Sequence, residues 1–192
     1  SEQTEIKIEL SPEGLEPAVK ALGDGSGKDR RIYFFDTPEL ELFKAGIELR
    51  ARIKSDGDGD TTIKTKDLTD SQFDSDFFTR DGFKCEWDRL AGISPGDRSC
   101  SYTDDRGALE FAHVLVSRDR AARSLFGSRQ IDFFEQVALP RLKIPDPWNA
   151  LKPLGPVQAR VWKGSAPFAT DLEMTIEYWE IPGANRLLEV SV

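Results

Sequence analysis

Apolar and charged residues alternate at every second position in many short segments of this chain of 192 residues. Side chains at positions i and i+2 of a strand point to the same face of a sheet, so each such segment is typical of a strand with one apolar and one charged face. The alternation predicts eight strands, near residues 3–10, 30–35, 46–54, 61–66, 82–89, 156–162, 171–178 and 186–192. We therefore expect a fold built on a β-sheet.

Helical signals fill some of the intervals between these strands. Residues 11–22 begin with serine, proline and glutamate, an order typical of a helix start, and residues 38–46 end on a glycine typical of a helix end. The region 106–139 has apolar residues at helical spacing, and several prolines follow it. We expect one domain over residues 1–192, with a helical and proline-rich insertion at about 104–155.

The overall charge and hydrophobicity exclude several classes of protein. The chain has 26 lysines and arginines against 34 aspartates and glutamates, a net charge of −8, which disfavours binding to nucleic acid. No apolar stretch approaches the roughly 18 residues of a membrane-spanning helix, and the N-terminus lacks the pattern of a signal peptide. The two cysteines are too few for a disulfide framework, so we expect a cytoplasmic protein in which Cys85 is a buried thiol.

The charges on the predicted strands are sorted by sign. One group is basic and lies on two neighbouring strands, and the other is acidic and lies on the last two: Arg50, Arg52, Lys64 and Lys66 against Glu173, Glu177 and Glu189. A sheet with one face in water explains the alternation alone. Like charges on neighbouring strands repel, however, so the sorting favours a closed barrel that holds a polyanion and metal ions between the groups. The expected fold class is α+β, an eight-stranded antiparallel β-barrel with flanking helices.

Charged motifs follow one another in a definite order along the chain. They are Glu5-Ile6-Lys7, Tyr33-Phe34-Phe35-Asp36-Thr37-Pro38, Leu49-Arg50-Ala51-Arg52, Ile63-Lys64-Thr65-Lys66, Lys84-Cys85-Glu86-Trp87-Asp88, Arg160, Glu173 to Glu177, and Leu188-Glu189-Val190-Ser191. Together they resemble the motifs of the CYTH domain, also called the triphosphate tunnel metalloenzyme superfamily. That family includes inorganic triphosphatases, thiamine triphosphatases and class IV adenylyl cyclases.

The resemblance implies an antiparallel tunnel of eight strands that binds a small triphosphate or polyphosphate together with Mg²⁺ or Mn²⁺. It implies that phosphate is bound by the basic residues Arg50, Arg52, Lys64, Lys66, Lys84 and Arg160. It implies that the metal is bound by the carboxylates Glu5, Glu86, Asp88, Glu173, Glu177 and Glu189. Lys7 is the expected catalytic residue, which would contact the substrate or position the nucleophile. Guanidinium and ammonium groups suit phosphate, and carboxylates suit hard divalent cations.

Two positions depart from the family's pattern. Gln3 stands where the first glutamate of the opening strand is expected, and Ser191 stands where the last glutamate of the closing strand is expected. Each change replaces an anionic ligand by a neutral side chain and therefore weakens a metal site. The departures bear directly on whether the chain is an active enzyme.

The expected function is that of a metal-dependent phosphohydrolase that cleaves inorganic triphosphate or a small organic triphosphate. One alternative is a polyphosphate- or nucleotide-binding module without catalysis, which the departures at Gln3 and Ser191 favour. The other is a class IV adenylyl cyclase-like lyase. Its typical His-Phe-Tyr signature is missing from the sequence, so this alternative ranks lower.

The remaining motifs favour structural roles. Residues 56–60 resemble the opening of a calcium loop but continue with Thr61 in place of glycine, which favours a hairpin turn. His113, the single histidine, lies among apolar residues, which favours a residue that packs a helix over a catalytic base. A solvated helix face is expected for Arg118, Arg120 and Arg123, with a lid helix as the alternative. A loop over the barrel mouth is expected for Phe73, Phe77 and Phe78.

Overall fold

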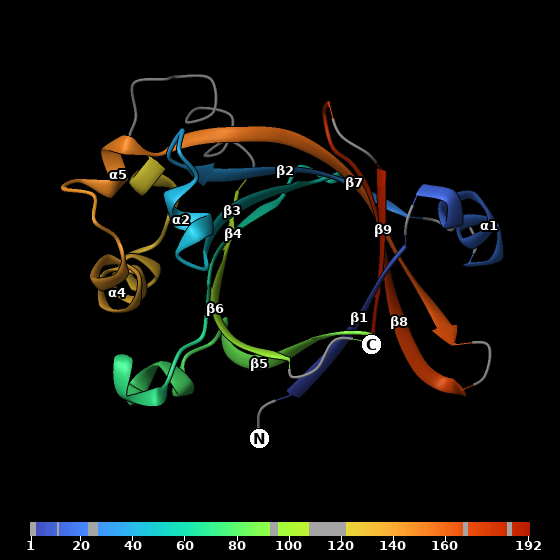
Figure 1. Ribbon diagram of the computed structural model, residues 1–192, viewed down its shortest axis with the longest axis horizontal. Coiled ribbons are helices and arrows are strands. Elements are labelled where there is room, and N and C mark those ends of the chain that lie inside the picture. The colour runs from blue at the N-terminus through green and yellow to red at the C-terminus, as the bar shows by residue number, and fades with distance from the viewer. Residues whose placement is uncertain are drawn as a thin grey trace.

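The computed structural model describes residues 3–10, 12–22, 27–92, 96–107, 122–166, 169–183 and 186–192. The strands in this part of the chain are β1 (Gln3–Leu10), β2 (Lys28–Asp36), β3 (Ile47–Lys54), β4 (Gly59–Lys66), β5 (Phe83–Leu90), β6 (Asp97–Arg106), β7 (Lys152–Ala166), β8 (Ala169–Glu180) and β9 (Arg186–Ser191). They close into a barrel in the order β1-β5-β6-β4-β3-β2-β7-β8-β9, and β9 pairs with β1 (Figure 1). The predicted α+β barrel is confirmed.

The barrel differs from the prediction in two respects. Its described part has nine strands in place of the expected eight, and the ladder between β1 and β5 is parallel in a barrel that was expected to be antiparallel throughout. The parallel pair is possible because β2, β3 and β4 lie between β1 and β5 in the sequence and form the long connection that parallel neighbours require. The eight predicted strands all overlap observed ones.

β6 is the strand that the sequence prediction missed. Its segment from Asp97 to Arg106 is mostly polar and has only Cys100 and Tyr102 as buried residues of the hydrophobic core. Pairing with β4 on one side and β5 on the other satisfies its backbone, so it forms a strand without apolar alternation. The predicted insertion at about 104–155 overlaps the end of β6, and residues 108–121 lie outside the described residues.

The helices lie outside the barrel. They are α1 (Pro12–Leu22), α2 (Glu41–Lys44), α4 (Ser128–Val137), α5 (Pro147–Ala150) and the 3₁₀ helices η1 (Asp70–Gln72), η2 (Ser75–Thr79), η3 (Ala122–Leu125) and η4 (Leu139–Arg141). Figure 1 shows α1 on one side of the barrel and α2, α4 and α5 on the opposite side. Among the described residues, no helix combines the length and apolar character needed to cross a membrane.

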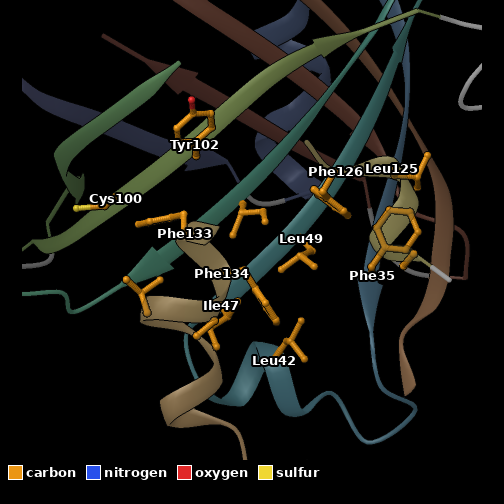
Figure 2. Packing of buried hydrophobic residues seen from close by; sticks show 14 of the residues in the cluster. Phe35, Leu42, Ile47, Leu49, Cys100, Tyr102, Leu125, Phe126, Phe133 and Phe134 are labelled. Carbon is orange, nitrogen blue, oxygen red and sulfur yellow. The ribbon is translucent and has the colours of Figure 1, made fainter. Parts of the chain in front are cut away.

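The larger hydrophobic core lies between the outer wall of the barrel and the helices. On β3, alternate residues such as Ile47 and Leu49 are buried in this core. Figure 2 shows them packed near Phe133 and Phe134 of α4 and Leu42 of α2. Because the apolar faces of the strands bury themselves against the helices, the charged faces point into the barrel.

Gln130 fastens α4 to the barrel. Its side chain is fully buried, and its amide nitrogen donates hydrogen bonds to the backbone carbonyls of Thr61 (2.8 Å) and Tyr102 (3.0 Å). Its amide oxygen accepts from the Thr61 hydroxyl (2.8 Å) and from the backbone N–H of Gly127 (3.0 Å). The amide thus bridges β4, β6 and the start of α4.

We predict that Gln130→Leu lowers the free energy of unfolding by about 2–4 kcal/mol, because it leaves buried carbonyl and hydroxyl groups without partners. Gln136→Leu is the matched control on the same helix, since its amide bonds to Asp74 are exposed, and it should cost less than about 1 kcal/mol. Urea unfolding followed by circular dichroism measures both. Equal losses for the two variants would contradict the bridging role.

Cys85 and Cys100 form a disulfide between β5 and β6. The two residues are directly opposite in the antiparallel ladder, with 4.0 Å between their Cα atoms. The expected free thiol at Cys85 is therefore wrong, and the reason is that its partner lies on the strand that was not predicted. Disulfides persist mainly in oxidising compartments, so this bond weighs against the cytoplasmic location, which stays a prediction.

Replacing both cysteines by alanine is expected to lower the free energy of unfolding by about 3 kcal/mol, since the bond closes a loop with a sequence separation of 15 residues. The measurement is urea unfolding with and without dithiothreitol. Reductant should destabilise the wild type and leave the double variant unchanged. Two reactive thiols in the urea-unfolded, unreduced wild type would show that the bond is absent.

Candidate functional site

A cavity of about 360 Å³ lies inside the barrel. Its walls come from the inward faces of the strands, where charged residues occupy every second position. Nine of the residues predicted from the sequence line it: Glu5, Lys7, Arg50, Arg52, Lys64, Lys84, Glu86, Glu177 and Glu189. The side chains come from six strands that are far apart in sequence, and closure of the barrel brings them together.

Most charged residues that line the cavity are sorted by sign onto two walls. The exceptions are Lys7 and Lys84 on strands of the acidic wall and Glu48 on a strand of the basic wall. The other carboxylates lie on β8, β9, β1 and β5, which follow one another around the barrel (Figure 1): Glu177, Glu189, Glu5 and Glu86. The basic wall is formed by Arg50 and Arg52 of β3 and Lys64 of β4. The cavity therefore has an acidic and a basic wall, as the sorting of charge by strand predicted.

Lys7 lies within the acidic wall. Its ammonium is 3.4 Å from Glu5, 3.5 Å from Asp88 and 3.8 Å from Glu189. Burial alone would lower the pKa of Lys7, but the charges of Glu189, Glu5 and Asp88 outweigh it and the pKa is raised. Lys7 is thus a permanent cation, so it can donate hydrogen bonds to a ligand but cannot accept a proton.

A second lysine, Lys64, crosses to the acidic wall. Its ammonium is 2.7 Å from Asp88 and 3.5 Å from Glu86, a carboxylate that is itself buried. Burial would raise the pKa of Asp88, but hydrogen bonds from Lys64 and Ser99 and the charges of Lys64 and Lys7 lower it to about 2. By contrast, burial and the neighbouring carboxylates Glu177, Glu5 and Glu9 raise the pKa of Glu189, which Lys7 opposes only in part.

These shifts predict that, in the metal-free protein, the pKa of Asp88 lies below its ordinary value and the pKa of Glu189 lies above its ordinary value. Carboxyl ¹³C NMR should place the Asp88 midpoint near pH 2 and that of Glu189 above its ordinary 4.5. Because the folded pKa of Asp88 lies below 3.8, its ionised form stabilises the fold above about pH 4 and this contribution is lost as the pH falls toward 2. Lys64→Met should move the Asp88 midpoint upward, and coincident midpoints in the wild type would refute the assignment.

Three carboxylates are grouped closely enough to hold a metal ion. Oxygen atoms of Glu5, Glu86 and Asp88 lie within 4.8 Å of one another. One Asp88 oxygen, Oδ1, is buried and accepts no hydrogen bond, although the Lys7 ammonium lies 3.5 Å away. A set of carboxylate oxygens with a spare buried acceptor fits a hard divalent cation such as Mg²⁺ or Mn²⁺.

On the basic wall, Arg52 is held by a buried carboxylate. Its Nε donates to Asp60 Oδ1 at 2.8 Å, and Asp60 is directly opposite Arg52 in the β3–β4 ladder with only 2% of its surface exposed. Lys54 is 3.9 Å from the same carboxylate. Asp60 therefore fixes the orientation of the Arg52 guanidinium relative to the cavity.

Four residues predicted for the site are not part of the cavity lining. One of them, Asp88, lies next to it and contacts Lys7 and Lys64 of the lining. Lys66 and Glu173 share the inward faces of their strands but lie at the barrel ends, where they are half or more exposed and pair with Asp97 and Lys163. Arg160 points outward from β7 and pairs with Asp29 at 2.9 Å. The inward positions next to it are Ala159 and Val161, so the arginine motif of the resemblance falls on the opposite face of this strand.

The two departures from the family's pattern lie on β9 and β1. Ser191 lines the cavity, so a neutral hydroxyl occupies a place on the acidic wall. Gln3 pairs with Glu86 through the β1–β5 ladder, and its side chain lies outside the described part of the structure. The described carboxylate group of Glu5, Glu86 and Asp88 involves neither residue.

Several residues of the site were missed by sequence reasoning. Glu48 lines the cavity 3.4 Å from Arg50, and its place in the alternation of β3 could have identified it. Arg30 pairs with Glu177 at 3.5 Å, and burial together with the charge of Arg52 lowers its pKa. Phe34 and Trp179 also line the cavity. The sequence pattern did not identify them, because apolar residues were expected on the outer face of each strand.

The other sequence motifs take structural roles where they are described. Residues 55–58 form the turn between β3 and β4, closed by a hydrogen bond from Lys54 N to Asp58 O of 2.7 Å, so the predicted hairpin is confirmed. Phe73 and Phe77 are buried in the outer core beside Phe83, and Phe78 is exposed although its ring contacts Phe83, so the expected loop over the barrel mouth is not seen there. Arg123 is exposed beside Glu135, whereas His113, Arg118 and Arg120 lie outside the described residues.

Comparisons with known proteins identify the fold. A candidate adenylate cyclase from Bacillus halodurans has a TM-score of 0.63 and 16% identity, over 100% of this chain and 79% of that one. HpAC1 from Hippeastrum, a candidate adenylyl cyclase with a dominant triphosphatase activity, has a TM-score of 0.60 and 15% identity, over 97% of this chain and 77% of that one.

Neither protein-family models nor curated proteins give a match to the sequence. The two solved structures, at 16% and 15% identity, establish the architecture of the chain. They share the closed barrel and confirm the fold that the ordered motifs implied. The protein therefore has the barrel fold of these two adenylate cyclase candidates.

Proposed function

We propose that this protein is a metal-dependent phosphohydrolase that cleaves inorganic triphosphate or a small organic triphosphate inside its barrel. The observation that carries the proposal is the cavity with a basic wall opposite a carboxylate wall. A triphosphate with its metal ion presents both negative oxygens and a cation, so it complements both walls at once. The dominant triphosphatase activity of HpAC1, which shares the fold, supports the proposal.

The basic residues of the cavity bind and orient the phosphate chain in this account. Arg50 and Arg52 offer guanidinium groups that can bind two phosphate oxygens at once, and Asp60 already holds one of them in place. Lys64 and Lys84 add ammonium groups from β4 and β5. Preorganised cations of this kind stabilise the charge that builds up during phosphoryl transfer.

Glu5, Glu86 and Asp88 would hold the metal ion, with Glu177 and Glu189 on the same wall. A bound Mg²⁺ or Mn²⁺ supplies charge neutralisation at the phosphate oxygens. Lys7 stays protonated among its three carboxylates, so it donates hydrogen bonds to a phosphate oxygen or to the attacking water and does not act as the base. This assigns Lys7 a positioning or charge-stabilising role at the reacting end of the chain.

Two observations favour a module that binds triphosphate without cleaving it. Ser191 stands in place of a carboxylate on the acidic wall, and the ammonium groups of Lys7 and Lys64 already form ion pairs with the proposed metal ligands Glu5, Glu86 and Asp88. A cyclase is the third possibility, since both solved structures are named as cyclase candidates. A small anionic ligand as the partner is part of the same proposal.

The proposal is tested by phosphate release from a panel of inorganic, thiamine and adenosine triphosphates with Mg²⁺ and with Mn²⁺. We expect release of phosphate that EDTA abolishes. Formation of cyclic AMP from ATP would identify the cyclase instead. Tight binding of triphosphate without release of phosphate under any of these conditions would identify the non-catalytic module.

A further inference from the structure

One part of the cavity wall is apolar. Ile32 of β2 and Val157 and Ala159 of β7 form a small buried cluster, and Phe34 and Trp179 pack against it while also lining the cavity. Ile32 is paired with Val157, and Ala159 is paired with Trp179, so the cluster runs continuously across three strands. The rest of the cavity lining is charged or polar, so the strip offers an apolar surface that the binding of phosphate alone does not require.

The strip lies between the two charged walls. β2 and β7 follow the basic strand β3 in the barrel order and precede the acidic strand β8. Phe34 is directly opposite Arg50 in the β2–β3 ladder, so the aromatic surface begins beside the proposed phosphate site. A ligand held by Arg50 can therefore extend a covalently attached group over the strip.

The polar atoms near the strip need both kinds of hydrogen-bonding partner. Arg50 Nε and Trp179 Nε1 are buried donors without an acceptor, and Glu48 Oε1 is a buried acceptor without a donor. Glu48 lies 3.4 Å from Arg50 Nη1 but accepts no hydrogen bond there. Phosphate oxygens of a fully ionised triphosphate can satisfy Arg50 Nε. An acceptor atom on an attached ring can satisfy Trp179 Nε1, and an N–H or O–H group on that ring can satisfy Glu48.

We propose that this cavity selects triphosphates that carry a planar ring with an N–H or O–H donor, in preference to inorganic triphosphate. The ring stacks on Phe34 and Trp179, and the donor binds Glu48. A cavity of about 360 Å³ is within the range of sites for small organic ligands. The inference rests on the proposed triphosphate site and names the class of its substrate.

Isothermal titration calorimetry with EDTA present tests the selection without turnover. The probes are ATP, thiamine triphosphate and inorganic triphosphate, and the first two distinguish a purine nucleoside from a pyrimidine–thiazolium group. We expect at least one ring-bearing probe to bind the wild type about tenfold or more tightly than inorganic triphosphate. Trp179→Ala should remove that difference and leave the affinity for inorganic triphosphate unchanged.

Two further variants separate stacking from folding. Trp179→Phe keeps an aromatic ring and should retain most of the preference, and Phe43→Ala removes an exposed aromatic on α2 and should change nothing. If inorganic triphosphate binds as tightly as both ring-bearing probes, or if Trp179→Ala weakens all three equally, the selection is refuted. Absence of binding by all three probes overturns the inference and the proposed function together. Selective binding without any release of phosphate overturns the proposed function alone.

Discussion

Arg52→Ala is expected to lower kcat/KM for triphosphate hydrolysis by about 100-fold or more, because it removes a preorganised cation from the transferred phosphate chain. The loss has a second cause. Asp60, which is 2% exposed and accepts from Arg52 Nε at 2.8 Å, loses this hydrogen bond and keeps only the Lys54 ammonium, 3.9 Å away, as a partner for its negative charge beside the cavity. Steady-state phosphate release measures the effect.

Two companion variants sharpen this prediction. Asp60→Asn keeps the shape of the side chain but weakens its hold on Arg52, so we expect a smaller loss that appears mainly in KM. Arg160→Ala replaces an arginine that belongs to the sequence resemblance but points away from the cavity and pairs with Asp29. Because Arg160 points away from the cavity, we expect wild-type activity for Arg160→Ala. A loss equal to that of Arg52→Ala would show that Arg160 contributes to the active site, as the sequence resemblance implied.

Glu5→Gln is expected to reduce Mg²⁺- or Mn²⁺-dependent turnover by about 100-fold or more while triphosphate binding without metal is kept or improved. The substitution removes one anionic ligand from the group of Glu5, Glu86 and Asp88, and it also removes a carboxylate 3.4 Å from Lys7. The metal concentration for half-maximal activity should rise. Metal titrations of phosphate release provide the measurement.

Glu173→Gln is the matched control for this second prediction. The alternation of residues along β8 places Glu173 on the inward face, but its side chain is exposed at the barrel end beside Lys163. Its activity and metal dependence should equal those of the wild type. Unchanged metal dependence in Glu5→Gln, or an equal loss in Glu173→Gln, would show that the carboxylates of the cavity are not the metal ligands.

The alternation of residues along individual strands made much of the site predictable. On β3, Ile47, Leu49 and Ala51 are buried outside the barrel and Arg50 and Arg52 line the cavity, as the period of two indicates. Sorting of charge between strands then indicated a closed barrel, since like charges on adjacent strands of an open sheet would repel without a ligand between them.

Features that depend on pairing partners could not be predicted in the same way. β6 has few apolar residues, so its place between β4 and β5 follows from hydrogen bonding in the closed barrel and not from its own pattern. The Cys85–Cys100 disulfide depends on β6, and the parallel β1–β5 ladder depends on how the barrel closes. Lys66 and Glu173 were wrongly expected in the site for another reason. Alternation predicts which face of the strand a residue lies on, but it does not predict whether the residue lies at the middle or at the end of the barrel.

The charges that line the cavity are balanced among the described residues. Five cations face five carboxylates: Lys7, Arg50, Arg52, Lys64 and Lys84 against Glu5, Glu48, Glu86, Glu177 and Glu189. A bare triphosphate would add several negative charges to this neutral lining, whereas a divalent cation on the acidic wall offsets part of them. The balance therefore predicts that metal and triphosphate bind cooperatively.

Calorimetric titration of the wild-type protein with inorganic triphosphate, in EDTA and in Mn²⁺, tests this central claim most directly. We expect Mn²⁺ to tighten triphosphate binding by about tenfold or more, which corresponds to a coupling free energy of about 1.4 kcal/mol between two ligands of opposite charge in one cavity. Triphosphate affinity that is the same in Mn²⁺ and in EDTA would contradict a shared metal and phosphate site in the barrel.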